Sequence, residues 1–417
     1  MSDEAKRQIS YQPTNGLSYD PSEAKYWDED ALDEEIERVF EVCHGCRMCF
    51  KYCDSFPILF SAIDNEHDGD VRKLTPLDTE RVMDACFQCK LCEVQCPYTP
   101  RDGHEFQLDF PKLVHRYDAI RYRKHEQPHK LRLKVLEDPD RASAMARASF
   151  GMANVMNRVG IHRWFMEKLV GIDRRKLLPD FAQTTFESWA KGAGLMAKGV
   201  GGEVVLFQTC YVQGNEPQIG MDTVEVLEKN GVDVRCEKGL ECCGMPAWEG
   251  GNLELLRKKA HANLNRLMPH VDAGAKVIVL NPTCSMMLRR EYPELYHTPC
   301  HLRTQGVGFK GRDLLRKIPG VAPVTVMECC GHDGTHAMTV EGFEYSIRVG
   351  QKAFDEMNEA DAEIWATDCP LAAIQFQQHA GVKPLHPMSI LARAYREDGF
   401  DAPKALPSGE TPEGDPK

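Results

Sequence analysis

Cysteine spacing is the feature of this sequence that carries the most chemical information. One pattern occurs twice, as Cys43-x2-Cys46-x2-Cys49-x3-Cys53 and as Cys86-x2-Cys89-x2-Cys92-x3-Cys96-Pro97. Three cysteines at this spacing bring their sulfurs around three corners of one cubane, because a short turning backbone wraps it, and the fourth cysteine points away. The spacing therefore predicts two [4Fe–4S] clusters.

The fourth cysteine of each motif is expected to complete the neighbouring cluster, as in bacterial two-cluster ferredoxins. This rule assigns to cluster 1 the residues Cys43, Cys46, Cys49 and Cys96. It assigns to cluster 2 the residues Cys86, Cys89, Cys92 and Cys53. Asp54 stands where the first motif would carry a proline, so we expect a perturbed turn and potential there, with ligation intact.

Two other uses of these eight cysteines compete with this interpretation. Disulfides are disfavoured because nothing in the chain looks secreted and a Cys-x2-Cys-x2-Cys run is too tight for disulfide geometry. Zinc is the stronger rival, since paired Cys-x2-Cys elements make four-thiolate sites. Zinc ribbons, however, leave no role for the third and fourth cysteine of each motif, so the spacing favours iron–sulfur clusters.

Length, charge and composition bound the class of protein. At 417 residues the chain can hold two or three domains, and 17 cysteines without a secretory signal indicate a reducing compartment. No run approaches the roughly 18 apolar residues of a transmembrane helix. The net charge of −12 argues against nucleic-acid binding. We expect a cytoplasmic protein that contacts the inner face of the membrane, if at all, peripherally and not through a segment that spans it.

The N-terminal third is expected to be an arm followed by a mainly helical domain. Residues 1–32 lack periodicity and predict an extended arm. Residues 33–125 predict the two-cluster ferredoxin domain, with a short helix over 33–40 leading to Cys43 and a helix starting near Thr79 leading to Cys86. Apolar residues between the motifs, such as Phe56, are expected to shield the clusters from water.

Residues 126–202 predict a helical connector. A basic run over 116–132 is interpreted as a solvated helix face, with a partner-docking patch as the alternative. Apolar residues then recur at helical spacing: Met152, Val155, Met156, Val159, Trp164, Phe165, Leu169 and Val170. Such a stripe predicts core packing, and contact with a quinone or a membrane subunit is the alternative.

From residue 203 strands alternate with helices. Strands are predicted over 203–207, 232–234 and 276–280, with helices over 220–230 and 253–267 between them. This alternation predicts an α/β unit with a parallel sheet, and most cysteines fall just past the carboxyl ends of its strands.

The cysteine pattern of this unit repeats. The first copy is Cys210, Cys242, Cys243 and Cys284, with gaps of 31 and 40 residues. The second copy is Cys300, Cys329, Cys330 and Cys369, with gaps of 28 and 38 residues, and a strand over 363–367 precedes its last cysteine. An internal duplication explains both copies, giving lobes over 203–293 and 294–398 and then a disordered tail over 399–417.

Adjacent cysteines in both lobes suggest metal or redox chemistry. Neighbouring thiolates can ligate separate irons, and Gly244 or Gly331 permits close backbone approach. The alternative is that these are buried thiols that behave as small apolar side chains. The repeated spacing favours metal binding in at least one lobe.

The Cys-Cys-Gly repeats, with the segment Tyr-His-Thr-Pro-Cys-His-Leu-Arg over 296–303, resemble the cysteine-rich CCG domain. That domain occurs in heterodisulfide reductase subunits, in the iron–sulfur subunit of glycolate oxidase and in one subunit of anaerobic glycerol-3-phosphate dehydrogenase. The whole layout is similar to the last of these groups, over about residues 40–100 and 203–395. The resemblance implies a chain that passes electrons from a flavoprotein dehydrogenase towards a quinone.

Departures from the heterodisulfide reductase pattern limit what the resemblance implies. There the domain ends in Cys-x2-Cys and five cysteines hold a noncubane cluster, whereas here Asn281 and Ala366 occupy the first position of that pair. A four-thiolate cluster, or a site completed by Asn281 or a histidine, stays open. Cys236 fits no family position and is interpreted as structural.

Four histidines near the second lobe could ligate a metal or relay protons: His297, His301, His332 and His336. Each alone is more often a hydrogen-bonded structural residue. His332 and His336 follow Cys330 closely, and a quinone or disulfide site needs a proton donor.

Taken together, the sequence predicts an α+β multidomain iron–sulfur protein: a ferredoxin domain followed by a duplicated α/β CCG domain. Its expected function is electron transfer from a flavoprotein dehydrogenase acting on glycerol-3-phosphate, glycolate or lactate, with two [4Fe–4S] clusters, a possible further cluster in the lobes and no assigned catalytic residue. The alternatives are a heterodisulfide-reductase-like enzyme and a non-enzymatic redox sensor. No Gly-x-Gly-x2-Gly or Walker pattern indicates NAD, FAD or ATP.

Overall fold

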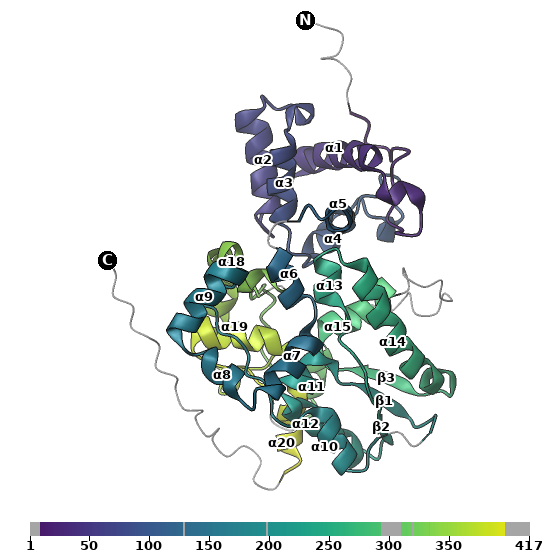
Figure 1. Ribbon diagram of the computed structural model, residues 1–417, viewed down its shortest axis with the longest axis vertical. Helices are drawn as coiled ribbons and strands as arrows, with labels where there is room; N and C mark the ends of the chain where they lie inside the picture. Colours follow the sequence, from purple (N-terminus) through teal and green to yellow (C-terminus); the bar gives the residue numbers. More distant parts are fainter. Residues whose placement is uncertain are drawn as a thin grey trace, which may run out of the picture.

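The structure is a computed structural model that describes residues 9–127, 130–196, 199–292, 310–318, 321–332 and 334–396. Cys300, His297, His301 and the predicted tail over 399–417 lie outside these ranges. Figure 1 shows the N-terminal helices gathered at one end of the molecule, above a larger body that holds the sheet and the C-terminal helices.

The N-terminal part is helical. Its α-helices are α1 (Glu29–Cys46), α2 (Ser55–Ser61), α3 (Pro76–Asp84), α4 (Leu91–Gln95) and α5 (Phe110–Lys124), joined by the short turns η3 (Ala62–Glu66), η4 (Val71–Lys73) and η5 (Pro100–Asp102). Helix α1 is longer than the predicted 33–40, because the Asp28 carboxylate caps its N-terminus and the chain turns only at Arg47, at φ 55°. Helix α3 likewise begins earlier than Thr79, at a capping box between Thr75 and Asp78.

The residues between the two cysteine motifs form one apolar core with α1 and α5. Phe56, Leu59 and Ile63 are buried in that core, and cysteines of both motifs pack against it. The packing therefore agrees with the prediction that the residues between the two motifs shield the cysteines from water.

The N-terminal arm is attached to α5 by one buried arginine. Arg116 donates hydrogen bonds to the carbonyl oxygens of Gly16 and Tyr26, at 2.8 and 2.7 Å. The arm also contains the short helix η2 (Ala24–Trp27), whose Tyr26 is buried. For Arg116 the solvated-face interpretation of the basic run is therefore wrong: the side chain is buried because it satisfies backbone carbonyls.

The connector consists of α6 (Lys130–Leu136), α7 (Pro139–Ala148), α8 (Met152–Met156), α9 (Gly160–Val170) and α10 (Phe186–Gly192). The predicted core packing of its apolar stripe is wrong for most of the residues concerned. Met152, Val155, Trp164, Phe165 and Leu169 are all exposed. The helical period was right, but it does not tell which face of a helix meets the protein.

The first lobe is the predicted parallel α/β unit. Strands β1 (Val204–Phe207), β2 (Val234–Cys236) and β3 (Lys276–Val279) form a sheet in the order β2-β1-β3, with both pairs parallel. Its helices are α11 (Thr209–Gly214), α12 (Pro217–Lys229), α13 (Met245–Glu249), α14 (Leu253–Asp272) and α15 (Pro282–Met286), followed by the π-helical turn η6 (Met287–Glu291). Figure 1 shows α14 beside this sheet.

The regular elements described in the second lobe are helices. It contains α17 (Lys310–Leu315), η8 (His336–Met338), α18 (Val340–Glu359), α19 (Pro370–Ala380) and α20 (Pro387–Ala394). The strand predicted over 363–367 is reduced to a single parallel bridge between Ala366 and Leu385. The Leu385 N–H donates to the Trp365 carbonyl oxygen and the Thr367 N–H to that of Leu385, and the pairing goes no further because α20 begins at Pro387.

Among the residues that the structure describes, no helix is both long and apolar enough to cross a membrane.

Candidate functional site

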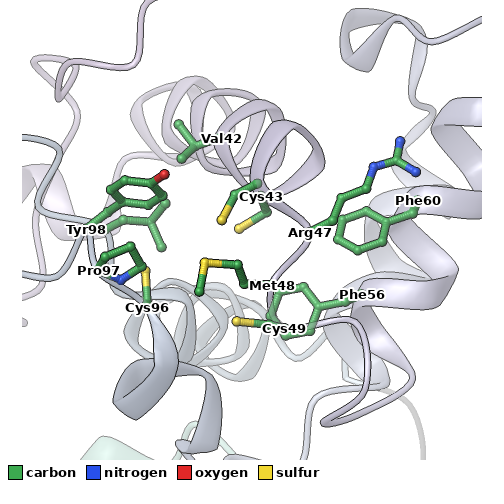
Figure 2. A pocket seen from close by; sticks show the side chains of 12 residues that line it. Val42, Cys43, Arg47, Met48, Cys49, Phe56, Phe60, Cys96, Pro97 and Tyr98 are labelled. Atoms are coloured by element: carbon green, nitrogen blue, oxygen red, sulfur yellow. The ribbon is translucent and has the colours of Figure 1, made fainter.

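The structure brings the predicted ligands of cluster 1 together. Cys43, Cys46, Cys49 and Cys96 all line one cavity of about 20 Å³, whose other walls include Phe56. In Figure 2 the sulfurs of Cys43, Cys49 and Cys96 gather around the same space as the side chain of Met48. Cys96 thus joins the first motif from a distance of nearly fifty residues, as the crossed assignment requires.

The second set is also crossed. The pKa of the Cys86 thiol is raised by burial and then by the nearby Cys53 and Cys89. Burial raises the pKa of the Cys92 thiol too, and Cys86, Cys89 and Cys53 raise it further. Cys53 therefore lies with the second motif, although it belongs to the first in sequence.

These closely spaced thiols are suited to binding a cationic group. Burial, followed by the neighbouring Cys96 and Cys46, raises the pKa of Cys49 to about 12, so the thiolates cannot coexist without a cation. Iron bound by thiolates supplies that cation and releases the protons. Within the described ranges, no three His, Cys, Asp or Glu side chains converge closely enough to hold a single metal ion.

The two sets are neighbours. The Cys49 thiol lies 3.9 Å from the carbonyl oxygen of Cys92, which connects a residue of the first set to one of the second. Tight backbone turns shape both loops: Arg47, Gln88 and Lys90 have φ values of 55°, 60° and 61°. Left-handed conformations are costly for residues with side chains, and they are retained here where the backbone must wrap each set.

The first lobe places its four cysteines at the carboxyl edge of the sheet. Cys210 follows β1 in α11, the Cys242–Cys243 pair follows β2, and Cys284 lies in α15 after β3. The pKa of Cys242 is lowered because the thiols of Cys210 and Cys243 hydrogen-bond to it. The predicted edge position is correct, and the four sulfurs form one connected group.

The glycine after each cysteine pair has the same role in both lobes. The Gly244 N–H donates to the Cys242 sulfur at 3.5 Å, and the Gly331 N–H donates to the Cys329 sulfur at 3.4 Å. A Cβ on Gly331 would lie 2.0 Å from the Ser346 carbonyl oxygen, and φ is +72° there. Both observations agree with close backbone approach at a duplicated thiol turn.

A cavity of about 600 Å³ joins the two lobes. Cysteines from three parts of the chain line it: Cys89, Cys210, Cys242, Cys243, Cys284, Cys330 and Cys369. Much of the remaining lining is apolar, and it includes Met166 and Phe181 of the connector. The volume suits a small organic ligand.

Asn281, which stands in place of a family cysteine, and Cys236, which fits no family position, differ in role. Asn281 caps α15, accepting from the Thr283 and Cys284 N–H groups at 2.9 and 3.3 Å, and its amide nitrogen lies 3.9 Å from the Cys369 sulfur. It therefore links the two lobes at the cavity. Cys236 is in β2, buried in a separate apolar core, where burial raises its pKa to about 12.

Of the histidines, only His332 lines the large cavity among the described residues. Burial lowers its pKa to about 3, so it is neutral at physiological pH. His336 instead packs against the rings of Phe87 and Tyr345, at 5.6 and 5.9 Å. The structure thus separates two histidines that sequence reasoning paired.

Two buried lysines near the lobe cysteines were not predicted from the sequence. Lys259 is ion-paired with Asp138 and Asp140 of the connector at 2.8 and 2.7 Å. Lys176, also from the connector, donates to Gln375, and burial lowers its pKa to about 8, opposed by the nearby Cys330. Nothing in their spacing marks them, because each is brought to the site by tertiary packing alone.

Asp54 has a structural reason to replace proline. Its backbone N–H, which a proline would lack, donates to the Tyr345 hydroxyl of α18 at 2.8 Å. Its carboxylate also pairs with Arg348 at 2.9 Å. The turn that begins at Cys53 is thereby attached to the second lobe.

Replacing Asp54 by proline is expected to leave the iron content unchanged and to lower stability by about 1–3 kcal/mol, because the Tyr345 hydroxyl loses its donor. The φ of −74° at Asp54 suits a proline ring. Asp54→Ala keeps the N–H and loses only the partly exposed ion pair, so it should cost less. Anaerobic thermal unfolding of both variants checks this, and equal losses would contradict the role given to the N–H.

Buried charges join the ferredoxin part to the first lobe. Lys90 is ion-paired with Glu291 of η6 and lies 4.6 Å from the centre of the Trp248 ring. Glu93 of α4 pairs with Arg290. Both contacts start from the loop that carries Cys89 and Cys92, so this ligand loop is fixed against the lobe.

Comparisons with known families agree with this architecture. The model of the 4Fe–4S dicluster domain matches residues 42–99, and that of the cysteine-rich CCG domain matches residues 204–289 and again 295–377. The chain is therefore an iron–sulfur protein with a dicluster domain followed by a duplicated CCG domain. No solved structure gives a significant match.

The chain is homologous to proteins of known redox systems. It is 28% identical over 306 residues to one subunit of the anaerobic glycerol-3-phosphate dehydrogenase of Escherichia coli (strain K12), a match that covers 63% of this chain and 77% of that one. It is 26% identical over 214 residues to lactate utilization protein A of Bacillus velezensis, covering 40% and 87%. One subunit of the fumarate reductase (CoM/CoB) of Methanothermobacter marburgensis is 24% identical over 238 residues, covering 48% and 47%.

Proposed function

We propose that the chain is the electron-transfer subunit of a flavoprotein dehydrogenase complex of the glycerol-3-phosphate, glycolate or lactate type. One observation carries this proposal: the first thiol set contacts the second at Cys49 and Cys92, and Cys89 of the second set lines the cavity of the lobes. The three sites thus form a continuous series through the molecule. The name of one relative, a glycerol-3-phosphate dehydrogenase subunit, supports a dehydrogenase partner, and another relative is named for lactate utilization.

In this proposal three groups of thiols each hold one cluster. The first [4Fe–4S] cluster is held by Cys43, Cys46, Cys49 and Cys96, and the second by Cys53, Cys86, Cys89 and Cys92. A further cluster is held by Cys210, Cys242, Cys243 and Cys284. Such clusters, when bound, supply one-electron transfer. The protein's part is to exclude water with Phe56 and its neighbours and to fix the loops with buried charges. The acceptor is a quinone or a similar small molecule, and attachment to the membrane is peripheral.

A second candidate is reduction of a disulfide at the large cavity, because thiols of both lobes line it. The absence of the fifth cysteine at Asn281 and Ala366 counts against this function. An artificial electron donor discriminates the two candidates: only the second predicts disulfide turnover by the isolated chain.

Anaerobic counting of iron and acid-labile sulfide, with EPR of the dithionite-reduced protein, tests the proposal. About twelve irons are expected, about eight of them in the two crossed sets with signals of coupled cubanes. Replacing Cys242 and Cys243 by serine should remove about four irons, and about eight irons in the unaltered protein would mean that the first lobe holds no cluster. Zinc without iron would overturn the proposal.

A further inference from the structure

The outer surface of the connector carries several large apolar side chains that no other described part of the chain covers. Phe150 is 93% exposed, and its φ of 51° is a conformation that bulky residues rarely adopt. Along α9, Ile161, Trp164, Phe165 and Leu169 follow at helical spacing and are all exposed, with Leu169 at 67%. We call Phe150 and these four residues, together with Val155 of α8, the α8–α9 face.

Figure 1 shows α8 and α9 along the same edge of the molecule. A protein interior cannot account for this face, since no described element covers it and the side chains remain exposed. Large apolar side chains that are exposed along one edge of a fold mark an interaction site.

Charge indicates which kind of surface would cover the α8–α9 face. Residues 141–180 contain eight Lys or Arg and three Asp or Glu, in a chain whose net charge is −12. The Arg158 and Lys168 side chains beside the face are 72% and 59% exposed, and each lies near a carboxylate, Arg158 at Asp180 and Lys168 at Glu167. Two of the three carboxylates are largely buried, because the Glu167 and Asp173 side chains are 11% and 3% exposed.

An apolar helical face bordered by exposed cations, with tryptophan and phenylalanine among its apolar residues, has the chemistry of helices that lie in the headgroup region of an anionic bilayer. A partner protein would also cover apolar surface, but the excess of cations on this one segment of an acidic chain favours an anionic bilayer, although Arg163 and Lys176 of the segment are buried.

The same segment reaches the lobe cavity from its other side. Asn157, just after α8, and Met166 of α9 both line that cavity of about 600 Å³. The connector therefore separates the cavity from the α8–α9 face by the thickness of one helix layer. A lipid-soluble acceptor taken from the bilayer would have a short way to the lobe cysteines.

We propose that the α8–α9 face, with Arg158, Lys168 and Arg174 at its border, seats the protein on an anionic lipid bilayer with the lobe cavity directly behind. This inference rests on the proposed function, since a protein that delivers electrons to a quinone has to work at the membrane. It gives the connector, residues 126–202, the role of membrane-contacting wall of the cavity.

Vesicle binding of the full-length, anaerobically purified iron-loaded protein tests the proposal. We expect co-sedimentation with vesicles of phosphatidylcholine and phosphatidylglycerol, weaker binding to phosphatidylcholine alone, and loss of binding at high salt. The double variant Phe165→Ser/Leu169→Ser should lower the partition coefficient at least about tenfold. Leu77→Ser, on the exposed side of α3, is the matched control and should not change it.

The EPR spectrum of the reduced double variant has to match the unaltered protein, which shows that the clusters and fold are intact. If binding is unchanged in the double variant, the proposal is wrong. It is also wrong if vesicles do not bind and the double variant instead loses co-purification with its flavoprotein partner, which would make the α8–α9 face a protein interface. Neither result depends on the iron count that tests the proposed function.

Discussion

Replacing Cys53 by alanine is expected to lower the anaerobic iron content by about four per chain. The informative result comes from double variants. If Cys53 and Cys86 serve one cluster, Cys53→Ala/Cys86→Ala should lose no more iron than either single variant, whereas Cys53→Ala/Cys43→Ala should lose about eight. The reason is the crossed geometry, in which Cys53 lies beside Cys86 and Cys89.

Iron and sulfide counts with EPR of the reduced variants measure this. Cys236→Ala is the control, because Cys236 is buried in the core around β2 and belongs to no set. The opposite pattern of the double variants, with additive loss for Cys53 and Cys86, would mean that each motif holds its own cluster.

Lys90→Met is expected to lower the free energy of unfolding by about 3–5 kcal/mol, because it leaves the buried Glu291 carboxylate without a partner. Both side chains of this pair are nearly inaccessible, at 7% and 3%. The methionine also loses the contact of the ammonium with the Trp248 ring, which adds to the loss.

The double variant Lys90→Met/Glu291→Leu should recover most of this stability, since it removes the uncompensated charge. Lys73→Met serves as the control, because Lys73 pairs with Asp68 at the surface and should cost no more than about 1 kcal/mol. Anaerobic denaturant unfolding measures all of them. A double variant as unstable as Lys90→Met alone would place the loss in the Cys89–Cys92 loop itself.

Local patterns predicted the parts of this protein that local chemistry determines. The spacing of Cys43 to Cys53 and of Cys86 to Cys96 indicated dicluster motifs, and the family comparison confirms the domain. The strands of the first lobe were found within two residues, because short apolar runs between turn residues have few other solutions. The CCG duplication was visible as a repeated register and is likewise confirmed.

What could not be predicted depends on contacts between distant segments. The stripe from Met152 to Leu169 has the same period whether its face meets a core or solvent, so the choice of core packing was wrong. Asp54 was visible as an exception, but its partner Tyr345 is 291 residues away. Lys176 and Lys259 carried no signal at all, because a single lysine in a helix or loop is ordinarily exposed.

The segment between the two motifs has a consequence for chain topology. Cys53 and Cys86 stand at the two ends of this 32-residue stretch and lie in the same set. A cluster held by both would close a loop, as a disulfide does, and restrict the unfolded chain by an amount on the order of 4 kcal/mol. Helices α2 and α3 lie inside that loop. Oxidative loss of the cluster would then remove a covalent constraint as well as a redox centre, so that air damage would destabilise the fold around α2 and α3.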